Sequence, residues 1–168
     1  MGKVQRGRFT ATVDDELVLF LIGMRFNKPW KIHRWWAVFV AMPRMLRQLA
    51  TVPELGLLHV QSGLMSGQPL VVCYFRSPEH LYRFSKDPDL THLGPWRRFN
   101  QKVRDSGDVG IWHETYRIGP ANTESVYGNM PLWGLAAAVG SEPAGRRGNS
   151  AEKRAGLTTV DAPAVAPY

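Results

Sequence analysis

The stretch from Leu17 to Phe26 is almost continuously apolar and ends at Asn27-Lys28-Pro29. Successive side chains of a β-strand point to opposite faces of its sheet, so a strand with one exposed face shows alternating apolar and polar residues. Here both sets of alternate positions are apolar. The run therefore predicts a strand that is covered on both faces, and it requires a fold with one layer on each side of the sheet.

The segments that follow predict the order helix, strand, strand, helix, strand. They are a helix over about 31–51, strands over 56–61 and 69–75, a helix that begins at Ser77-Pro78 and ends near Lys86, a further helix from His92 or Pro95 to Arg104, and a strand over 109–118. With the first strand this gives β-α-β-β-α-β, the ferredoxin-like α+β pattern.

The predicted helix over 31–51 contains a proline and an apolar stripe. Pro43 is expected to kink the helix or to split it in two, because proline cannot donate the helical hydrogen bond. The apolar residues at helical spacing are Trp36, Phe39, Val40, Leu46 and Leu49. This spacing predicts the helix face that packs on the sheet.

Helices in a ferredoxin-like domain cover only one face of the sheet, and the first strand is apolar on both. The simplest second layer is the sheet of another subunit, which makes a homodimeric α+β barrel with a pocket between sheet and helices. We expect a flexible N-terminal arm over residues 1–9, the barrel domain over 10–138 and a disordered tail over 139–168, which lacks periodicity.

Composition excludes several classes of protein. The net charge of +7 is spread along the chain with no nucleic-acid-binding motif, so no nucleic acid partner is expected. Cys73 is the single cysteine, which fits a reducing, cytoplasmic compartment. The apolar run is too short to span a bilayer. No His-x-x-x-His pair, glycine-rich phosphate loop or dinucleotide fingerprint occurs, so no metal site is predicted.

A second interpretation of the first helix is a membrane-surface helix. It rests on the tryptophans at 30, 35 and 36, which lie among Lys28, Lys31, Arg34, Arg44 and Arg47. The alternative is the helix layer of the barrel with its basic residues outside. We prefer the barrel, because a helix lying on a membrane leaves the strands with nothing to pack against, and we expect no membrane partner.

Five segments in order resemble the monooxygenase-like family of the fungal fumagillin pathway, many of whose bacterial members have no assigned function. They are residues 42–49, 53–58, 92–100, 109–116 and 127–131. The resemblance covers roughly residues 15–138. It implies a dimeric α+β barrel related to antibiotic-biosynthesis monooxygenases, a group whose relatives include cofactor-free oxygenases and haem enzymes. It names no substrate.

His113 is the first candidate site residue. On the predicted strand over 109–118 it shares a face with Ile111, whereas Glu114 points to the opposite face, so the two cannot form a simple dyad. A histidine at this place is either a core residue with a satisfied hydrogen bond, a general base, or an axial haem ligand.

His92, Trp96 and Asn100 are the other candidates, and they repeat about every four residues on one predicted helix. Trp96 and Asn100 offer hydrogen-bond donors beside an apolar wall, which would suit an enolate or peroxide oxygen in a dry pocket. The alternative is that both residues only pack or cap.

Together these features predict a small monooxygenase-like enzyme that oxidises an apolar or aromatic secondary metabolite with dioxygen. His113 would be the base, with Trp96 and Asn100 as donors. The cofactor stays open between none and haem b, which would bind through His113 in an oxygenase, peroxidase or dehydratase. A third hypothesis is a non-catalytic dimeric module that binds a small molecule.

Overall fold

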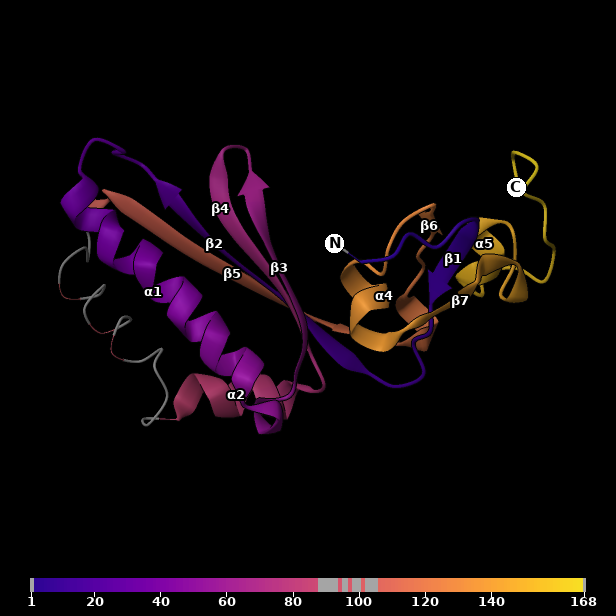
Figure 1. Ribbon diagram of the computed structural model, residues 1–168, viewed down its shortest axis with the longest axis horizontal. Helices are drawn as coiled ribbons and strands as arrows, with labels where there is room; N and C mark the ends of the chain where they lie inside the picture. Colours follow the sequence, from indigo (N-terminus) through magenta and orange to yellow (C-terminus); the bar gives the residue numbers. More distant parts are fainter. Residues whose placement is uncertain (1, 88–93, 95–96, 98–100, 102–105, 168) are drawn as a thin grey trace. The chain divides into compact units, whose positions relative to one another are not determined.

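The computed structural model describes residues 2–87, 94, 97, 101 and 106–167 (Figure 1). The chain divides into two compact units. Unit 1 comprises Met1–Leu17 and Arg117–Tyr168, and unit 2 comprises Val18–Tyr116. Among the described helices, none is both long and apolar enough to cross a membrane. This division differs from the predicted boundaries, which placed residues 10–138 in one domain.

Unit 2 is built on a four-stranded sheet with the order β3-β4-β2-β5. Its pairings β2–β4 and β3–β4 are antiparallel. In chain order this places the second, third, first and fourth strands side by side, which confirms the predicted ferredoxin-like α+β fold. The elements are β2 (Leu17–Phe26), α1 (Ile32–Thr51), η1 (Pro53–Leu55), β3 (Leu57–Met65), β4 (Gln68–Phe75), α2 (Pro78–Lys86) and β5 (Val109–Ile118).

One face of this sheet carries the helices and the core. Val18 of β2 and Phe75 of β4 are opposite each other and are almost completely buried. Leu49 of α1 and Leu81 and Phe84 of α2 belong to the same buried cluster. Figure 1 shows α1 running along the strands on this face, with α2 at one end of α1. Burial of apolar side chains between helices and sheet is thus what holds unit 2 together.

The other face of the sheet is also apolar. Leu19 and Leu21 of β2 lie opposite Tyr74 and Val72 of β4. These pairs alternate along the strands with the core pairs, so their side chains point to the face without helices. All four are partly buried. Strand β2 therefore carries apolar residues on both faces of the sheet, as the sequence predicts. That a second subunit covers this face stays a prediction.

Helix α1 packs with a stripe that matches the predicted one at Leu46 and Leu49, which join the main core, but not at Trp36 and Phe39. Trp35 and Val38 pack against the cluster of Met24 and Val109, and Met42 packs against the main core. Trp36 and Phe39, which were expected to face the sheet, remain 53% and 40% exposed. Apolar residues occupy more than one face of this helix, so spacing alone did not distinguish the packed stripe.

The predicted ends of the helices are close to the observed ones. Pro43 lies inside α1, which stays one helix rather than two. Helix α2 begins at Pro78 with Ser77 at its N-cap, as predicted. The Ser77 hydroxyl makes no capping bond to the helix backbone and instead lies 2.9 Å from Nδ1 of His80.

Unit 1 contains a small three-stranded sheet with the order β6-β1-β7, in which β1 pairs antiparallel with both neighbours. Thr10 and Ala11, the last two residues of β1, are buried, as are Leu135 and Ala136 of α4. The elements are β1 (Arg8–Ala11), η3 (Pro120–Asn122), β6 (Tyr127–Gly128), α4 (Gly134–Val139), β7 (Ser141–Pro143), η4 (Ala144–Arg146) and α5 (Ala151–Arg154).

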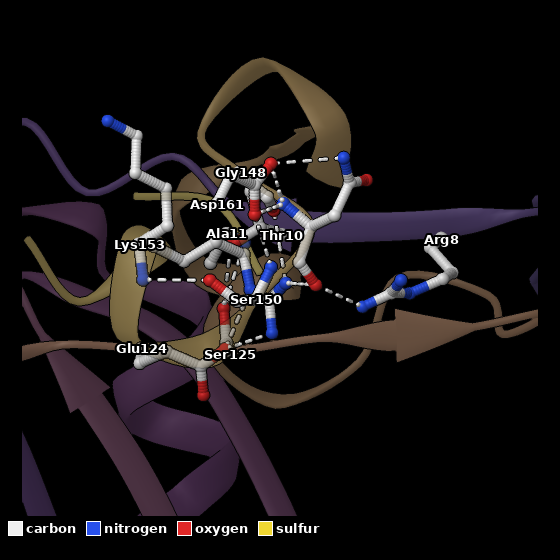
Figure 2. A network of polar contacts seen from close by, with 11 residues as sticks. Arg8, Thr10, Ala11, Glu124, Ser125, Gly148, Ser150, Lys153 and Asp161 are labelled. Atoms are coloured by element: carbon white, nitrogen blue, oxygen red, sulfur yellow. Dashed lines mark hydrogen bonds and ion pairs between the residues drawn. The ribbon is translucent and has the colours of Figure 1, made fainter. Parts of the chain in front are cut away.

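A network of polar contacts joins the segments of unit 1 after β7 to one another, to β1 and to residues 124–125 (Figure 2). The Asp161 carboxylate accepts hydrogen bonds from the backbone N–H groups of Asn149 and Ser150, at 2.9 and 2.8 Å. The guanidinium of Arg154, whose side chain is 4% exposed, forms an ion pair with Glu124 at 2.7 Å. It also donates to the carbonyls of Gly148 and Asn149. These bonds hold the loop 148–150 from both sides.

The structure differs here from the prediction of a disordered tail over 139–168. Strand β7 pairs with β1, and η4 and α5 follow it. The predicted flexible arm, residues 1–9, overlaps β1 at Arg8 and Phe9. The order in these segments comes from side-chain hydrogen bonds to backbone groups, which leave no apolar periodicity in the sequence.

Candidate functional site

A cavity of about 560 Å³ lies in unit 2 between the helix-covered face of the sheet and the two helices. Its size falls in the range of pockets that bind small molecules. Strand β2 and helix α1 supply most of its wall. The described residues that line it are Phe20, Ile22, Gly23, Met24, Val38, Phe39, Ala41, Met42, Pro43, Met45, Leu46, Ser62, Gly63, Leu64, Pro69, Leu70, Val71, Leu81, Phe84, Ser85 and Ile111.

This lining is almost entirely apolar. Among the described lining residues, the side chains able to donate or accept a strong hydrogen bond are those of Ser62 and Ser85. The Ser85 hydroxyl donates to the carbonyl of Tyr82 at 2.9 Å, which directs it toward the backbone. No charged side chain occurs among these lining residues. The cavity therefore suits an uncharged, apolar molecule, since a buried charge without a partner is strongly disfavoured.

His113 lies beside the cavity rather than in its described wall. It shares the helix-covered face with Ile111, as the sequence predicts, and its ring lies 5.7 Å from the ring of Phe20 between centroids. Phe20 itself lines the cavity, so His113 packs on one residue of the cavity wall. The His113 side chain is exposed in the isolated chain. A buried core histidine, one of the interpretations weighed for it, does not describe this position.

Glu114 makes its contact on the opposite face of the sheet. Tyr116 donates a 2.7 Å hydrogen bond to the Glu114 carboxylate, and this bond raises the pKa of Tyr116. On the same face, the indole of Trp112 lies over Gly23, where a Cβ atom would come within 2.5 Å of the ring. The structure thus agrees with the prediction that His113 and Glu114 form no dyad.

His92, Trp96 and Asn100 lie outside the described residues. Whether they reach the cavity with His113 stays a prediction. The sequence analysis proposed none of the described cavity-lining side chains as a site residue. Two signals were available: alternate residues on β2, such as Phe20 and Ile22, and the helical spacing of Val38, Met42 and Met45 on α1. Each signal also fits a core without a cavity. Periodicity indicates which side chains point inward, but not whether they fill the space between the sheet and the helices.

The remaining nucleophilic and ligating groups have other surroundings. Cys73 is buried in the core, and burial raises the pKa of its thiol to about 12, so it carries no thiolate near neutral pH. Burial also lowers the pKa of His59 on β3. Within the part of the chain that the structure describes, no three His, Cys, Asp or Glu side chains gather in a way that would hold a metal ion.

Haem would need an axial ligand in or next to the cavity. The described lining offers thioether sulfurs from Met24, Met42 and Met45, but no imidazole, thiolate or phenolate. It also has no cation to pair with the propionates. Within the described lining, haem would therefore find only thioether ligands, and His113 beside the cavity is the residue that would hold it.

This chain is similar in sequence to proteins of one known family. The family model of monooxygenase af470-like proteins matches residues 17–135. Monooxygenase af470 of Aspergillus fumigatus is 30% identical in an alignment over 155 residues, which covers 77% of this chain and 53% of that protein. The chain thus spans about half the length of this curated relative.

A similar solved structure is a conserved protein of unknown function from Bacteroides thetaiotaomicron, described as a possible oxidoreductase. It is 11% identical, with a TM-score of 0.40, and the alignment covers 62% of this chain and 99% of that one. The family match takes in the whole of unit 2 and continues into α4 of unit 1. By this match, the chain belongs to the monooxygenase af470-like family.

Proposed function

We propose that this chain is a monooxygenase that oxidises an uncharged apolar or aromatic secondary metabolite with dioxygen in the cavity of unit 2. The observation that carries the proposal is the cavity itself, which is about 560 Å³ in volume and apolar over nearly all of its described lining. Membership of a monooxygenase-like family supports the reaction class. The relative's name says nothing of the substrate.

The reaction we propose needs no cofactor, because the substrate supplies the electrons. A base removes a proton from an activated CH₂ group, and the resulting carbanion or enolate transfers electrons to dioxygen. A C–O bond forms to give a hydroperoxide after protonation. Loss of water then breaks the O–O bond and the second C–H bond and leaves a carbonyl group. One oxygen atom ends in the product and the other in water. An apolar cavity favours this chemistry by keeping the anion away from bulk water.

His113 is the residue we propose as the base. It lies on the helix-covered face of the sheet, its ring packs on Phe20, and histidine is the side chain that most often serves as a general base. Trp96 and Asn100 are proposed donors to the enolate or peroxide oxygen, with His92 as an additional polar group. These three assignments rest on sequence spacing.

We also propose that the active form is a homodimer in a reducing compartment such as the cytoplasm. The apolar face with Leu19, Leu21, Val72 and Tyr74 would lie against the same face of a second copy. Sedimentation at micromolar protein concentration tests this arrangement, and a monomeric mass would contradict it.

Oxygen uptake with a panel of anthrones, quinols and phenols tests the reaction. His113→Gln is expected to lower kcat about a hundredfold or more, the usual contribution of a positioned base. The matched control is His33→Gln, since His33 is exposed on α1. An equal loss in both variants, or none in either, would remove His113 from the mechanism.

A second pair of variants tests the cavity. Met42→Trp places a larger side chain into it, whereas Met65→Trp makes the same change at an exposed position on β3. We expect the first variant alone to lose substrate binding and turnover. Tight binding with no turnover of any compound would instead support a non-catalytic binding module. A haem absorption band that the parent protein shows and the His113→Gln variant lacks would contradict the cofactor-free reaction and assign a haem-dependent one.

A further inference from the structure

The cavity of unit 2 extends across the whole width of the four-stranded sheet. All four strands contribute to its wall, through residues such as Ser62 of β3, Val71 of β4, Ile22 of β2 and Ile111 of β5. Ser62 lies opposite Val71, and Val71 lies opposite Ile22. Neighbouring strands are about 4.8 Å apart, so the backbones of β3 and β5 are separated by about 14 Å across the sheet. The cavity therefore suits an elongated ligand that lies across the strands.

Ser62 places a hydroxyl group at the β3 end of this wall. Within the part of the chain that the structure describes, this hydroxyl has no hydrogen-bond partner, and the residue is exposed in the isolated chain. The second hydroxyl of the described lining, that of Ser85, already donates to the carbonyl of Tyr82 at 2.9 Å. A serine hydroxyl can both donate and accept. Of these two groups, Ser62 is thus the one that is available to a ligand.

His113 lies at the opposite edge of the same face. It follows Ile111 of the cavity wall by two residues on β5, and its ring lies 5.7 Å from that of Phe20. Strands β3 and β5 are the two edge strands of the sheet. A ligand that binds to Ser62 must therefore extend across β4 and β2 before it reaches His113.

The wall between these two ends suits aromatic rings. Thioether sulfurs make favourable contacts with the edges of aromatic rings, and phenylalanine rings pack edge to face on them. The wall carries both kinds of side chain, from Met24, Met42, Met45, Phe20, Phe39 and Phe84. An uncharged aromatic molecule would gain these contacts along its length and would leave no charge without a partner.

We propose that Ser62 selects the substrate of this cavity. Its hydroxyl binds a hydroxyl or carbonyl group at one end of an elongated, uncharged aromatic molecule, and the other end of that molecule lies toward His113. The recognition of the polar group depends on the cavity alone, whereas the orientation toward a base rests on the proposed function. A compound that carries its polar group and its activated CH₂ group at the same end should bind without being oxidised.

The test is equilibrium dialysis of the full chain with para-phenylphenol and para-methylbiphenyl. These compounds have nearly the same shape, but the methyl compound cannot form a hydrogen bond. Ser62→Ala is expected to weaken binding of the phenol about 3–10-fold, the net contribution of one hydrogen bond, and to leave binding of the methyl compound unchanged. Ser62→Thr keeps a hydroxyl and should retain most of the affinity for the phenol.

Ser85→Ala is the matched control, because the Ser85 hydroxyl already bonds to the backbone. This variant should not distinguish the phenol from the methyl compound. Met42→Trp, which places a larger side chain into the cavity, should weaken the binding of both.

Kinetics separate this inference from the proposed function. For a compound that the parent protein oxidises, Ser62→Ala should raise KM about 3–10-fold with kcat nearly unchanged, whereas His113→Gln lowers kcat. Binding that depends on Ser62, without oxygen uptake for any compound, would support recognition by Ser62 and contradict the oxygenase.

Four results would overturn the proposal. The first is an equal loss for both compounds in Ser62→Ala, which would mean that Ser62 only maintains the shape of the cavity. The second is unchanged binding of the phenol in that variant. The third is binding of both compounds that survives Met42→Trp, which would place them outside the cavity. The fourth is a parent protein that binds neither compound, which would remove the aromatic ligand class.

Discussion

The two units of this chain are held together by different kinds of interaction. Unit 2 has a core of apolar side chains between a sheet and two helices, centred on residues such as Val18 and Phe75. Unit 1 has short elements linked by charged side chains that bond to backbone groups, as Arg154 and Asp161 do. Apolar periodicity in the sequence therefore predicts the elements of unit 2 and almost none of those of unit 1.

The largest effect is expected in the core of unit 2. Phe75→Ala removes a ring that is 1% exposed and leaves a cavity, so it should lower the free energy of unfolding by about 3–5 kcal/mol. Urea unfolding followed by hydrogen exchange of residues 18–75 measures this loss. A loss below about 1 kcal/mol would show that unit 2 does not depend on its apolar core in the way described.

The next effect belongs to the polar network of unit 1. Arg154→Met removes an ion pair to Glu124 and two hydrogen bonds to backbone carbonyls, while keeping an unbranched apolar chain of similar length. We expect a loss of about 2–3 kcal/mol, since the Gly148 carbonyl and the Glu124 carboxylate lose this partner, while the Asn149 carbonyl keeps its hydrogen bond from Arg8.

Hydrogen exchange of residues 140–161 reports the Arg154→Met loss, and Arg146→Met, at an exposed arginine in the same unit, is the control. Unchanged exchange in Arg154→Met would mean that the network contributes nothing to the order of the segments after β7.

A smaller effect is expected at the outer face of the sheet in unit 2. In Gly23→Ala the new Cβ would meet the Trp112 ring at 2.5 Å, so the indole must shift. Overpacking of this kind costs about 1–3 kcal/mol. Gly63→Ala, where no atom lies within 4 Å of the added Cβ, is the control on β3. If both substitutions have the same cost, the Trp112 contact is not what restricts Gly23.

The smallest effect concerns the pH dependence of unit 1. The backbone N–H groups of Asn149 and Ser150 lower the pKa of the Asp161 carboxyl. Its contribution to stability is therefore complete above the ordinary aspartate pKa and is lost as the pH falls through the lower, folded value.

Acid titration followed by hydrogen exchange in residues 148–161 should show this loss. Asp161→Asn should remove the pH dependence and leave the segment less protected at neutral pH. An unchanged acid response in that variant would assign the dependence to another group.

Much of unit 2 could be predicted from the sequence. The strands Leu17–Phe26 and Val109–Ile118 and the start of α2 at Pro78 follow from apolar runs and from turn and capping residues. The placement of His113 opposite to Glu114 follows from strand alternation. These features depend on local periodicity, which the sequence contains directly.

Other features could not be predicted, because they depend on which groups meet in space. The packed stripe of α1 includes Trp35 rather than Trp36, and neighbouring residues with similar hydrophobicity do not reveal which of them faces the sheet. The cavity is space left unfilled between inward-facing side chains, and no residue type encodes it. The bonds of Asp161 join it to residues 149 and 150, a pairing with no pattern of its own.

The buried thiol of Cys73 gives this chain an internal reporter. It is the single cysteine, it lies in the core of unit 2, and its high pKa keeps it unreactive toward thiol reagents while the fold is intact. A maleimide added in short pulses would therefore label only molecules in which the sheet around β4 has opened. The rate of labelling would measure opening of unit 2 with no engineered probe, in the same sample where oxygen uptake is followed.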